Sequence, residues 1–190
     1  MSLDLLECPE DCDSLLSPVD FNPCAPDLRD AEIVYWLIAK GDQPLSNVQD
    51  PAELSTRISD DSTADTAIRR LLGIGAITAE FGAERKIPGG KINYAKNTYT
   101  GTLDIYDLND TNYEFMRSTS CNTQYRIWPV DSNGYIFGGN TGILAVVKGK
   151  NDITNNRDEL QVINLQFKYS ATRPPVRDAY VLAADDDNLL

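Results

Sequence analysis

Two stretches in the second half of the chain alternate apolar and polar residues with the period of two that half-buried β-strands show. They are TYTGTLDIYDL (98–108) and DELQVINLQFKYS (158–170). The residues that share one face are Tyr99, Leu103 and Ile105 in the first stretch and Ile163, Leu165, Phe167 and Tyr169 in the second. Because successive side chains of a strand point to opposite faces, this pattern predicts a mainly β fold whose strands bury one face.

Apolar runs bounded by turn residues predict the other strands. The run AEIVYWLIAKGD (31–42) is rich in Ile, Val, Tyr and Trp and stops at Gly41-Asp42, so a buried strand is expected there. Further strands are expected within residues 76–87, 123–131, 134–139 and 141–149. By contrast, PGGKINYAKN (88–97) is predicted to be a turn or an extended loop.

A short helix is predicted after the first strand. Asp50 is placed to cap a helix over about 51–58, with Pro51 at its first position. The next segment, TADTAIRRLLGIGA (63–76), leaves two alternatives open. It adds a further helical turn or two before Gly73, or it forms a long loop that folds over a neighbouring subunit.

A second helix is predicted where DLNDTNYE (107–114) breaks the strand pattern. Thr111, followed three residues later by Glu114, forms a capping box. The apolar side of this helix is expected to carry Tyr113, Met116 and Phe115. The Asp and Asn oxygens of the segment are interpreted as partners for local backbone amides rather than as calcium ligands.

The segment QYRIWPVDSNGYIFGGN (124–140) raises a choice between a hairpin turn and a calcium loop at Asp131-Ser132-Asn133-Gly134. An EF-hand loop requires a bidentate Glu at its twelfth position, which counted from Asp131 is Gly142. Asn133-Gly134 between aromatic runs is a hairpin signal instead. Since the glycine-rich stretches also lack the spacing of phosphate-binding loops, no metal or cofactor site is predicted.

Composition argues against catalysis and against nucleic-acid binding. The 190 residues include 17 Lys+Arg, 29 Asp+Glu and no histidine, for a formal net charge of −12. Without histidine the chain lacks the commonest general base and metal ligand, so no enzyme activity is expected. Binding to nucleic-acid phosphates requires clustered cations, so the excess of acidic residues argues against a nucleic-acid-binding protein. With no apolar run of about 18 residues and no signal-peptide pattern, no membrane segment is expected either.

Four cysteines raise the question of a zinc knuckle. Cys8, Cys12 and Cys24 follow the spacing C-x3-C-x11-C, and Cys121 lies far along the chain. Structural zinc sites usually show two close pairs, so reduced thiols are the preferred interpretation. A disulfide would require an oxidising environment.

The chain is expected to form one β-rich domain between two arms. Residues 1–30 hold four prolines and scattered acids without a sustained period, which indicates an extended arm that orders against a neighbour. Residues 31–170 are expected to form the β-rich domain, with a helical insertion at about 50–75. Residues 171–190, with a Pro-Pro pair and three consecutive aspartates, are expected to form an acidic C-terminal arm.

Two features of the sequence bear on carbohydrate chemistry. Trp128 lies before a proline within the ribbon and is interpreted as packing in a core or an interface. The alternative is an aromatic platform for sugars that includes Trp128 and Tyr135. Carboxylate pairs for glycoside hydrolysis are not selected by any spacing in the chain.

The order of elements through TGTLDIYDLNDTNYEFMRS and YRIWPVDSNGYIFGGNTGI resembles structural proteins of tailed-phage virions. The resemblance is to the tail-tube-like and neck-ring kind, including particle proteins of crAss-like gut phages, and covers roughly residues 31–170. It implies a β-sandwich or half-barrel with one flanking helix. Copies would pair strand edge to strand edge around a ring, while loops or termini embrace neighbours. No catalytic residue carries over.

The resemblance implies a non-enzymatic part of the virion, a ring or tube in the tail or neck through which DNA passes. Its partners would be copies of itself and other proteins of the tail, neck or portal region, assembled in the bacterial host cytoplasm. Acids lining the bore would repel DNA, so that it slides without adhesion. The alternatives are a capsid decoration or head-fibre anchor protein, a carbohydrate-binding β-sandwich, and a hydrolase working through paired carboxylates.

Overall fold

The computed structural model describes residues 32–58, 65–88, 91–107, 109–121, 123–151 and 161–182. Its strands are β1 (Ile33–Lys40), β2 (Arg69–Glu80), β3 (Glu84–Ile87), β4 (Lys91–Tyr94), β5 (Asn97–Ile105), β6 (Gln124–Asp131), β7 (Tyr135–Phe137), β8 (Ile143–Asn151), β9 (Ile163–Ala171) and β10 (Arg177–Ala179). Its helices are α1 (Pro51–Arg57) and α2 (Asp110–Ser118), the latter followed by a 3-10 turn, η2 (Thr119–Cys121). The predicted class, mainly β with short helices, is confirmed.

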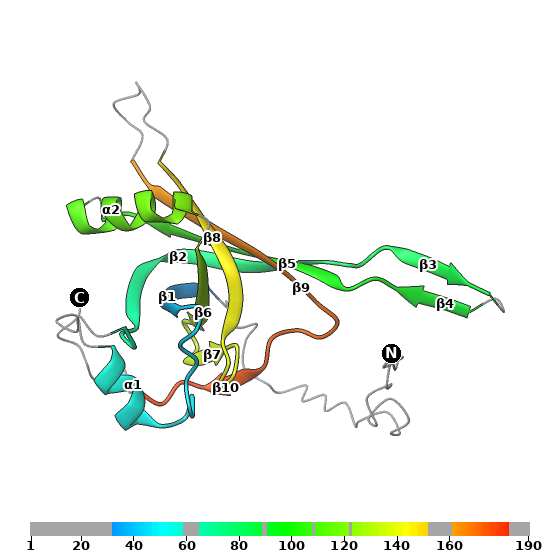
Figure 1. Cartoon of the computed structure of the whole chain (residues 1–190), viewed down its shortest axis with the longest axis horizontal. Coiled ribbons are helices and arrows are strands. Elements are labelled where there is room, and N and C mark those ends of the chain that lie inside the picture. The colour runs from blue at the N-terminus through cyan, green and yellow to red at the C-terminus, as the bar shows by residue number, and fades with distance from the viewer. Residues whose placement is uncertain are drawn as a thin grey trace, which may run out of the picture.

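Six antiparallel strands close into a barrel (Figure 1). Their order is β1-β2-β5-β9-β8-β6, and β6 pairs back with β1 from Lys40↔Tyr125 to Ile33↔Asp131. Different parts of strand β8 pair with different strands: residues 143–146 pair with β6, and residues 147–151 pair with β9. The sheet that was expected as a sandwich or half-barrel therefore closes on itself within one chain.

The barrel interior is filled by one apolar cluster. Strands β5 and β9 lie in register there, with Leu103 opposite Leu165, so the predicted buried faces of both strands are confirmed. Trp36 packs edge-on against Phe167, with ring centroids 4.9 Å apart. Gly101 makes room for that ring, because a Cβ at this position would lie 2.3 Å from it. The other buried members are Ile33, Ile38, Leu71, Ile105, Ile127, Ile143, Ala145, Val147 and Ile163.

Strand β1 is buried on both faces, which explains its continuous apolar sequence. Trp36 and Ile38 belong to the barrel interior, whereas Leu37 and Ala39 belong to a second cluster outside the barrel wall. Helix α1 covers that second cluster with Leu54, which is completely buried. The predicted strand at 31–42 and the predicted helix at 51–58, capped by Asp50, are thus both confirmed.

Both expectations for residues 63–76, a further helical turn or two and a long loop over a neighbour, are wrong from residue 69 onward, because residues 69–80 form strand β2. This strand pairs with β1 on one side and β5 on the other. Gly73 and Gly75 allow β5 to approach closely, since a Cβ at either position would lie 2.3 or 2.2 Å from a β5 carbonyl oxygen. Pairing on both edges therefore outweighs the helix propensity of RRLL. The helical insertion expected at about 50–75 is confined, among the described residues, to α1.

Two further expectations are corrected beyond β2. Residues 76–87 are not one strand, because the chain leaves the strand conformation at residues 81–83 before β3 begins. The loop expected at 88–97 instead contains β4, which pairs with β3. Together they form a hairpin that extends β2 and β5 away from the barrel (Figure 1). The strand expected at 158–170 begins at Ile163, and residues 158–160 lie outside the described part.

The described part of the expected C-terminal arm lies on the barrel. Strand β10 pairs with β7, and the amide of Tyr180 donates to the carbonyl of Gly134 at 2.8 Å. Tyr180 also meets the ring of Tyr35 edge-on, with centroids 5.9 Å apart. Tyr180, Val181 and Leu182 pack on the second apolar cluster, so the segment up to residue 182 covers this face of β1 and β6.

Candidate functional site

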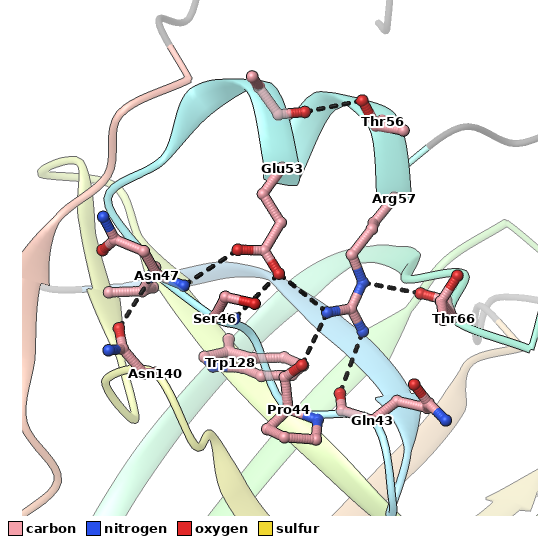
Figure 2. Close-up of polar contacts among 12 residues, drawn as sticks. Gln43, Pro44, Ser46, Asn47, Glu53, Thr56, Arg57, Thr66, Trp128 and Asn140 are labelled. Carbon is pink, nitrogen blue, oxygen red and sulfur yellow. Dashed lines mark hydrogen bonds and ion pairs between the residues drawn. The ribbon is translucent and has the colours of Figure 1, made fainter.

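A polar network joins helix α1 to the chain segments before and after it (Figure 2). The carboxylate of Glu53 accepts hydrogen bonds from the backbone amides of Ser46 at 2.9 Å and Asn47 at 3.0 Å. It also forms an ion pair with Arg57 at 3.3 Å. The guanidinium of Arg57 donates in addition to the carbonyl oxygens of Gln43, Pro44 and Thr66. Both charges are engaged with the surrounding chain, so we assign this cluster to holding α1 in place.

The protonation state of Glu53 follows from the same contacts. Burial alone would raise the pKa of this carboxyl, whereas the hydrogen bonds from Ser46 and Asn47 and the contact with Arg57 favour the carboxylate. The favourable contacts prevail, and the pKa of Glu53 lies below its ordinary value. The ionised form is therefore the one that the folded protein stabilises.

Trp128 lies in the core, as one of the two sequence-based alternatives predicted. It is completely buried, and its indole Nε1 donates to the carbonyl of Gly139 at 2.9 Å. Gly142 packs on the ring, since a Cβ there would lie 2.7 Å from it. The guanidinium carbon of Arg177 lies 4.4 Å from the ring centre of half-buried Tyr135. Trp128 and Tyr135 therefore do not form the exposed platform that the carbohydrate-binding alternative would use.

The Asp131-Ser132-Asn133-Gly134 segment is a turn, which confirms the hairpin interpretation. The amide of Gly134 donates to the carbonyl of Asp131 at 3.1 Å, and Gly134 adopts a φ of 77° that favours glycine. The buried carboxylate of Asp131 accepts from the amides of Asn133 at 3.0 Å and Tyr135 at 2.8 Å. This side-chain oxygen of Asp131 is therefore a hydrogen-bond acceptor for backbone amides of its own turn.

Helix α2 is present, but its predicted capping box is wrong. Asn109, two residues before Thr111, caps the helix by accepting a hydrogen bond from the amide of Asn112 at 2.8 Å. On the predicted apolar side, Phe115 and Met116 do pack against the barrel cluster. Tyr113 does not, and is 41% exposed.

An open cleft lies between α2, η2 and β8. Its lining residues are Glu114, Met116, Arg117, Ser118, Ser120 and Gly149. The hydroxyls of Ser118, Thr119 and Ser120 each donate to a carbonyl three residues earlier. Thr119 Oγ1 also accepts from the amide of Gly149 at 3.0 Å. These hydroxyls therefore end the helix and attach it to β8.

The described residues hold neither a metal-binding cluster nor a membrane-spanning helix. No three side chains of His, Cys, Asp or Glu gather there as a metal site would need. Cys121 is a free, exposed thiol, whereas Cys8, Cys12 and Cys24 lie outside the described residues, so reduced thiols at those positions stay a prediction. Within the same residues, no helix has the length and apolarity to cross a membrane.

The feature that stands apart from these structural contacts is the hairpin beyond the barrel, which we call the β-arm (residues 81–88 and 91–96). Strands β3 and β4 pair from Glu84↔Tyr94 to Ile87↔Lys91. Gly82 allows the two sides to approach at its base, because a Cβ there would lie 1.9 Å from the carbonyl oxygen of Ala95. Among the described strands, β3 and β4 pair only with each other. Each therefore has one edge whose backbone groups have no partner strand in this part of the chain.

The β-arm also exposes aromatic and cationic side chains. Phe81 is 95% exposed and Tyr94 is 64% exposed. Arg85, Lys86 and Lys96 are exposed as well. An exposed Phe side chain costs solvation free energy that burial against a partner would recover. The β-arm is therefore the candidate functional site of this barrel.

Sequence reasoning missed the β-arm, although a signal was present. The runs ERKI and KINY flank a Pro-Gly-Gly turn, and that order is typical of a hairpin. Comparison with known proteins adds no assignment: no protein-family model matches the chain, and no curated protein matches it either. The class that fold and site define is a closed antiparallel β-barrel with a projecting two-stranded arm.

Proposed function

We propose that this protein is a non-enzymatic structural component of a tailed-phage particle, which assembles as a ring or tube in the tail or neck. The observation that carries the proposal is the β-arm, with its exposed Phe81 and its open strand edges. The closed barrel with short helices is also compatible with the architecture that the tail-tube-like and neck-ring resemblance implies.

The physics of an isolated hairpin favours assembly. Two strands alone are marginally stable in water, and an open edge is a template for pairing with another chain. The barrel strands of the same chain are already paired around the closed sheet, so they do not supply that partner. A neighbouring copy does so in this proposal, and its surface removes Phe81 and Tyr94 from water.

The position of the β-arm favours a ring over a two-fold dimer. The arm and helix α2 lie toward opposite ends of the long axis (Figure 1). An arm that binds a different surface of the next copy makes a head-to-tail contact, and such contacts close into rings when the rotation between copies permits. The partners of the ring are then other proteins of the tail, neck or portal region. DNA passes through it without adhesion in this proposal, because a subunit with a formal net charge of −12 repels phosphates overall.

Native mass spectrometry of the full chain over a range of concentrations tests this proposal. We expect discrete species of several identical copies that grow with protein concentration. Phe81→Ser should shift the midpoint of assembly to a concentration at least about tenfold higher, equivalent to about 1.4 kcal/mol. The matched control Tyr106→Ser, at an aromatic residue that is 49% exposed outside the arm, should leave the midpoint unchanged. A chain that stays monomeric at every concentration contradicts the proposal.

A further inference from the structure

The β-arm is basic although the protein is acidic. Residues 84–96 contain Arg85, Lys86, Lys91 and Lys96 but only one acid, Glu84, which gives this segment a formal charge of +3. The whole chain has a formal charge of −12. A compact positive segment that projects from the molecule is suited to bind a negative surface.

The strongest negative segment of the chain is its N-terminus. Residues 1–30 contain eight Asp+Glu and one arginine, a formal charge of −7. The described residues outside the β-arm are almost neutral as a set, with eleven Lys+Arg against twelve Asp+Glu. Charge complementarity therefore selects the N-terminal segment rather than the barrel surface as the counterpart of the arm.

We propose that the β-arm binds the acidic N-terminal segment, residues 1–31, of a neighbouring copy. This inference rests on the proposed function, because it needs copies side by side. A contact within one chain would cover the arm without joining two molecules. Because the proposed function requires the arm to join copies, the bound segment is that of the neighbouring copy.

The composition and length of the segment fit this role. Its leucines, among them Leu5, Leu6, Leu15 and Leu16, supply apolar partners for Phe81 and Tyr94. An extended segment also suits an open strand edge, which binds extended chains through backbone hydrogen bonds. The described chain begins at Glu32, whose carbonyl accepts from the amide of Ser132 at 2.8 Å. If fully extended, thirty-one residues would span up to about 100 Å, against about 30 Å for a nine-residue strand such as β9.

Site-specific crosslinking of the full chain tests the contact. A photoreactive phenylalanine analogue replaces Tyr94, and equal amounts of unlabelled and 15N-labelled protein are mixed before assembly and irradiation. We expect crosslinked peptides that join position 94 to residues 1–31, with half of them containing one labelled and one unlabelled partner. Crosslinks of single isotopic composition would place the contact within one chain and overturn the proposal. Crosslinks to barrel residues alone in an assembled sample would also overturn it, while leaving the proposed function intact.

Charge reversal provides a second, independent measurement. Arg85→Glu with Lys96→Glu should raise the midpoint concentration of assembly at least about tenfold at low salt. The effect should shrink as salt approaches 0.15 M and above, where the screening length falls to about 8 Å. Lys148→Glu with Lys168→Glu changes the net charge equally on exposed barrel positions and should leave the midpoint unchanged.

Two results would overturn the inference. The first is an equal effect of both double variants, which would assign the change to net charge alone. The second is DNA binding by the arm: the unaltered protein retains double-stranded DNA, and only the Arg85→Glu, Lys96→Glu variant loses it. In that case no crosslink to residues 1–31 would form. That result would assign the arm to nucleic acid.

Discussion

The indole Nε1 of Trp128 donates a hydrogen bond of 2.9 Å to the carbonyl oxygen of Gly139. This contact ties β6 to the glycine-rich loop that follows β7, where Gly138, Gly139 and Gly142 have positive φ angles. Asn140, which follows Gly139 in that loop, accepts a hydrogen bond through its side-chain oxygen from the amide of Val48 at 2.9 Å. One buried side chain thus helps to join the barrel wall, the loop and the segment that leads into α1.

Replacement of Trp128 should therefore be costly. We expect Trp128→Ala to lower the free energy of unfolding by about 3–5 kcal/mol, because it leaves a large cavity. Trp128→Phe should cost less, about 1–3 kcal/mol, since it mainly leaves the Gly139 carbonyl without its donor. Urea unfolding followed through the fluorescence of Trp36 measures both. Tyr113→Ala, at an exposed site on α2, is the control, and an equally small effect of Trp128→Ala would contradict this packing.

Glu53 should make stability depend on pH in the acid range. Because its pKa is lower in the folded protein than in the unfolded chain, its contribution is present above the unfolded pKa and is lost as pH falls through the folded pKa. Glu53→Gln should lower the free energy of unfolding by about 1–3 kcal/mol at pH 7. The difference from the unaltered protein should shrink below about pH 4. Urea unfolding at pH 7 and pH 3 measures this, with exposed Glu80→Gln as the control, and a difference independent of pH would contradict it.

Gly82 should control the β-arm without controlling the barrel. Gly82→Ala places a Cβ 1.9 Å from the carbonyl oxygen of Ala95, so the two sides of the arm must separate. We expect the amide of Ala95, which donates to Ala83 at 2.9 Å, to exchange with deuterium at least about tenfold faster. Assembly should weaken while the barrel amides keep their protection. Unchanged exchange at Ala95 would contradict the close approach.

The C-terminal segment should open as a local unit. Tyr180→Ala removes the ring contact with Tyr35 and the packing on the second apolar cluster. We expect faster hydrogen exchange at the amide of position 180 and at Gly138, whose amide donates to the carbonyl of Val176 at 2.8 Å. The amide of Leu54 in α1 should be unaffected. Loss of protection throughout the barrel would show instead that the segment is inseparable from global stability.

A second consequence concerns the ionisation of Tyr35. Burial raises the pKa of this phenol, and its hydrogen bond with Tyr180 raises it further. Tyr180→Ala should therefore bring the pKa of Tyr35 down toward its ordinary value. NMR titration of the Tyr35 ring signal in the unaltered and altered proteins at alkaline pH measures the shift, and an unchanged pKa of Tyr35 would contradict the contact.

The strands that sequence analysis predicted correctly include β5 and β9, which have one clear apolar face, and β1, which is apolar on both faces. In β5 and β9 the buried positions alternate with polar ones, and β1 is apolar because two clusters bury it. The first part of strand β2 was not predicted, because its large apolar residues do not mark the buried face of the strand. Leu72 and Ile74 are about half exposed, and they alternate with Gly73 and Gly75, which let β5 approach. Such a strand is recognisable only from its neighbours.

The site was less predictable than the fold for a related reason. The α1 network depends on carbonyls of residues 43, 44 and 66, and backbone carbonyls leave no trace in the amino-acid pattern. The sequence does not separate Asn109 from Thr111 as the cap of α2, because both are capping residue types and they lie only two positions apart. The β-arm pairs only with itself among the described strands, so it lacks the apolar face by which the barrel strands were found.

Electron microscopy of the purified full chain tests the central claim most directly, which is that copies join through the β-arm into closed rings. We expect ring-shaped particles of uniform copy number, in which each β-arm lies on the adjacent copy. Single barrels at every concentration and salt condition, with the arm free of any neighbour, would contradict the account.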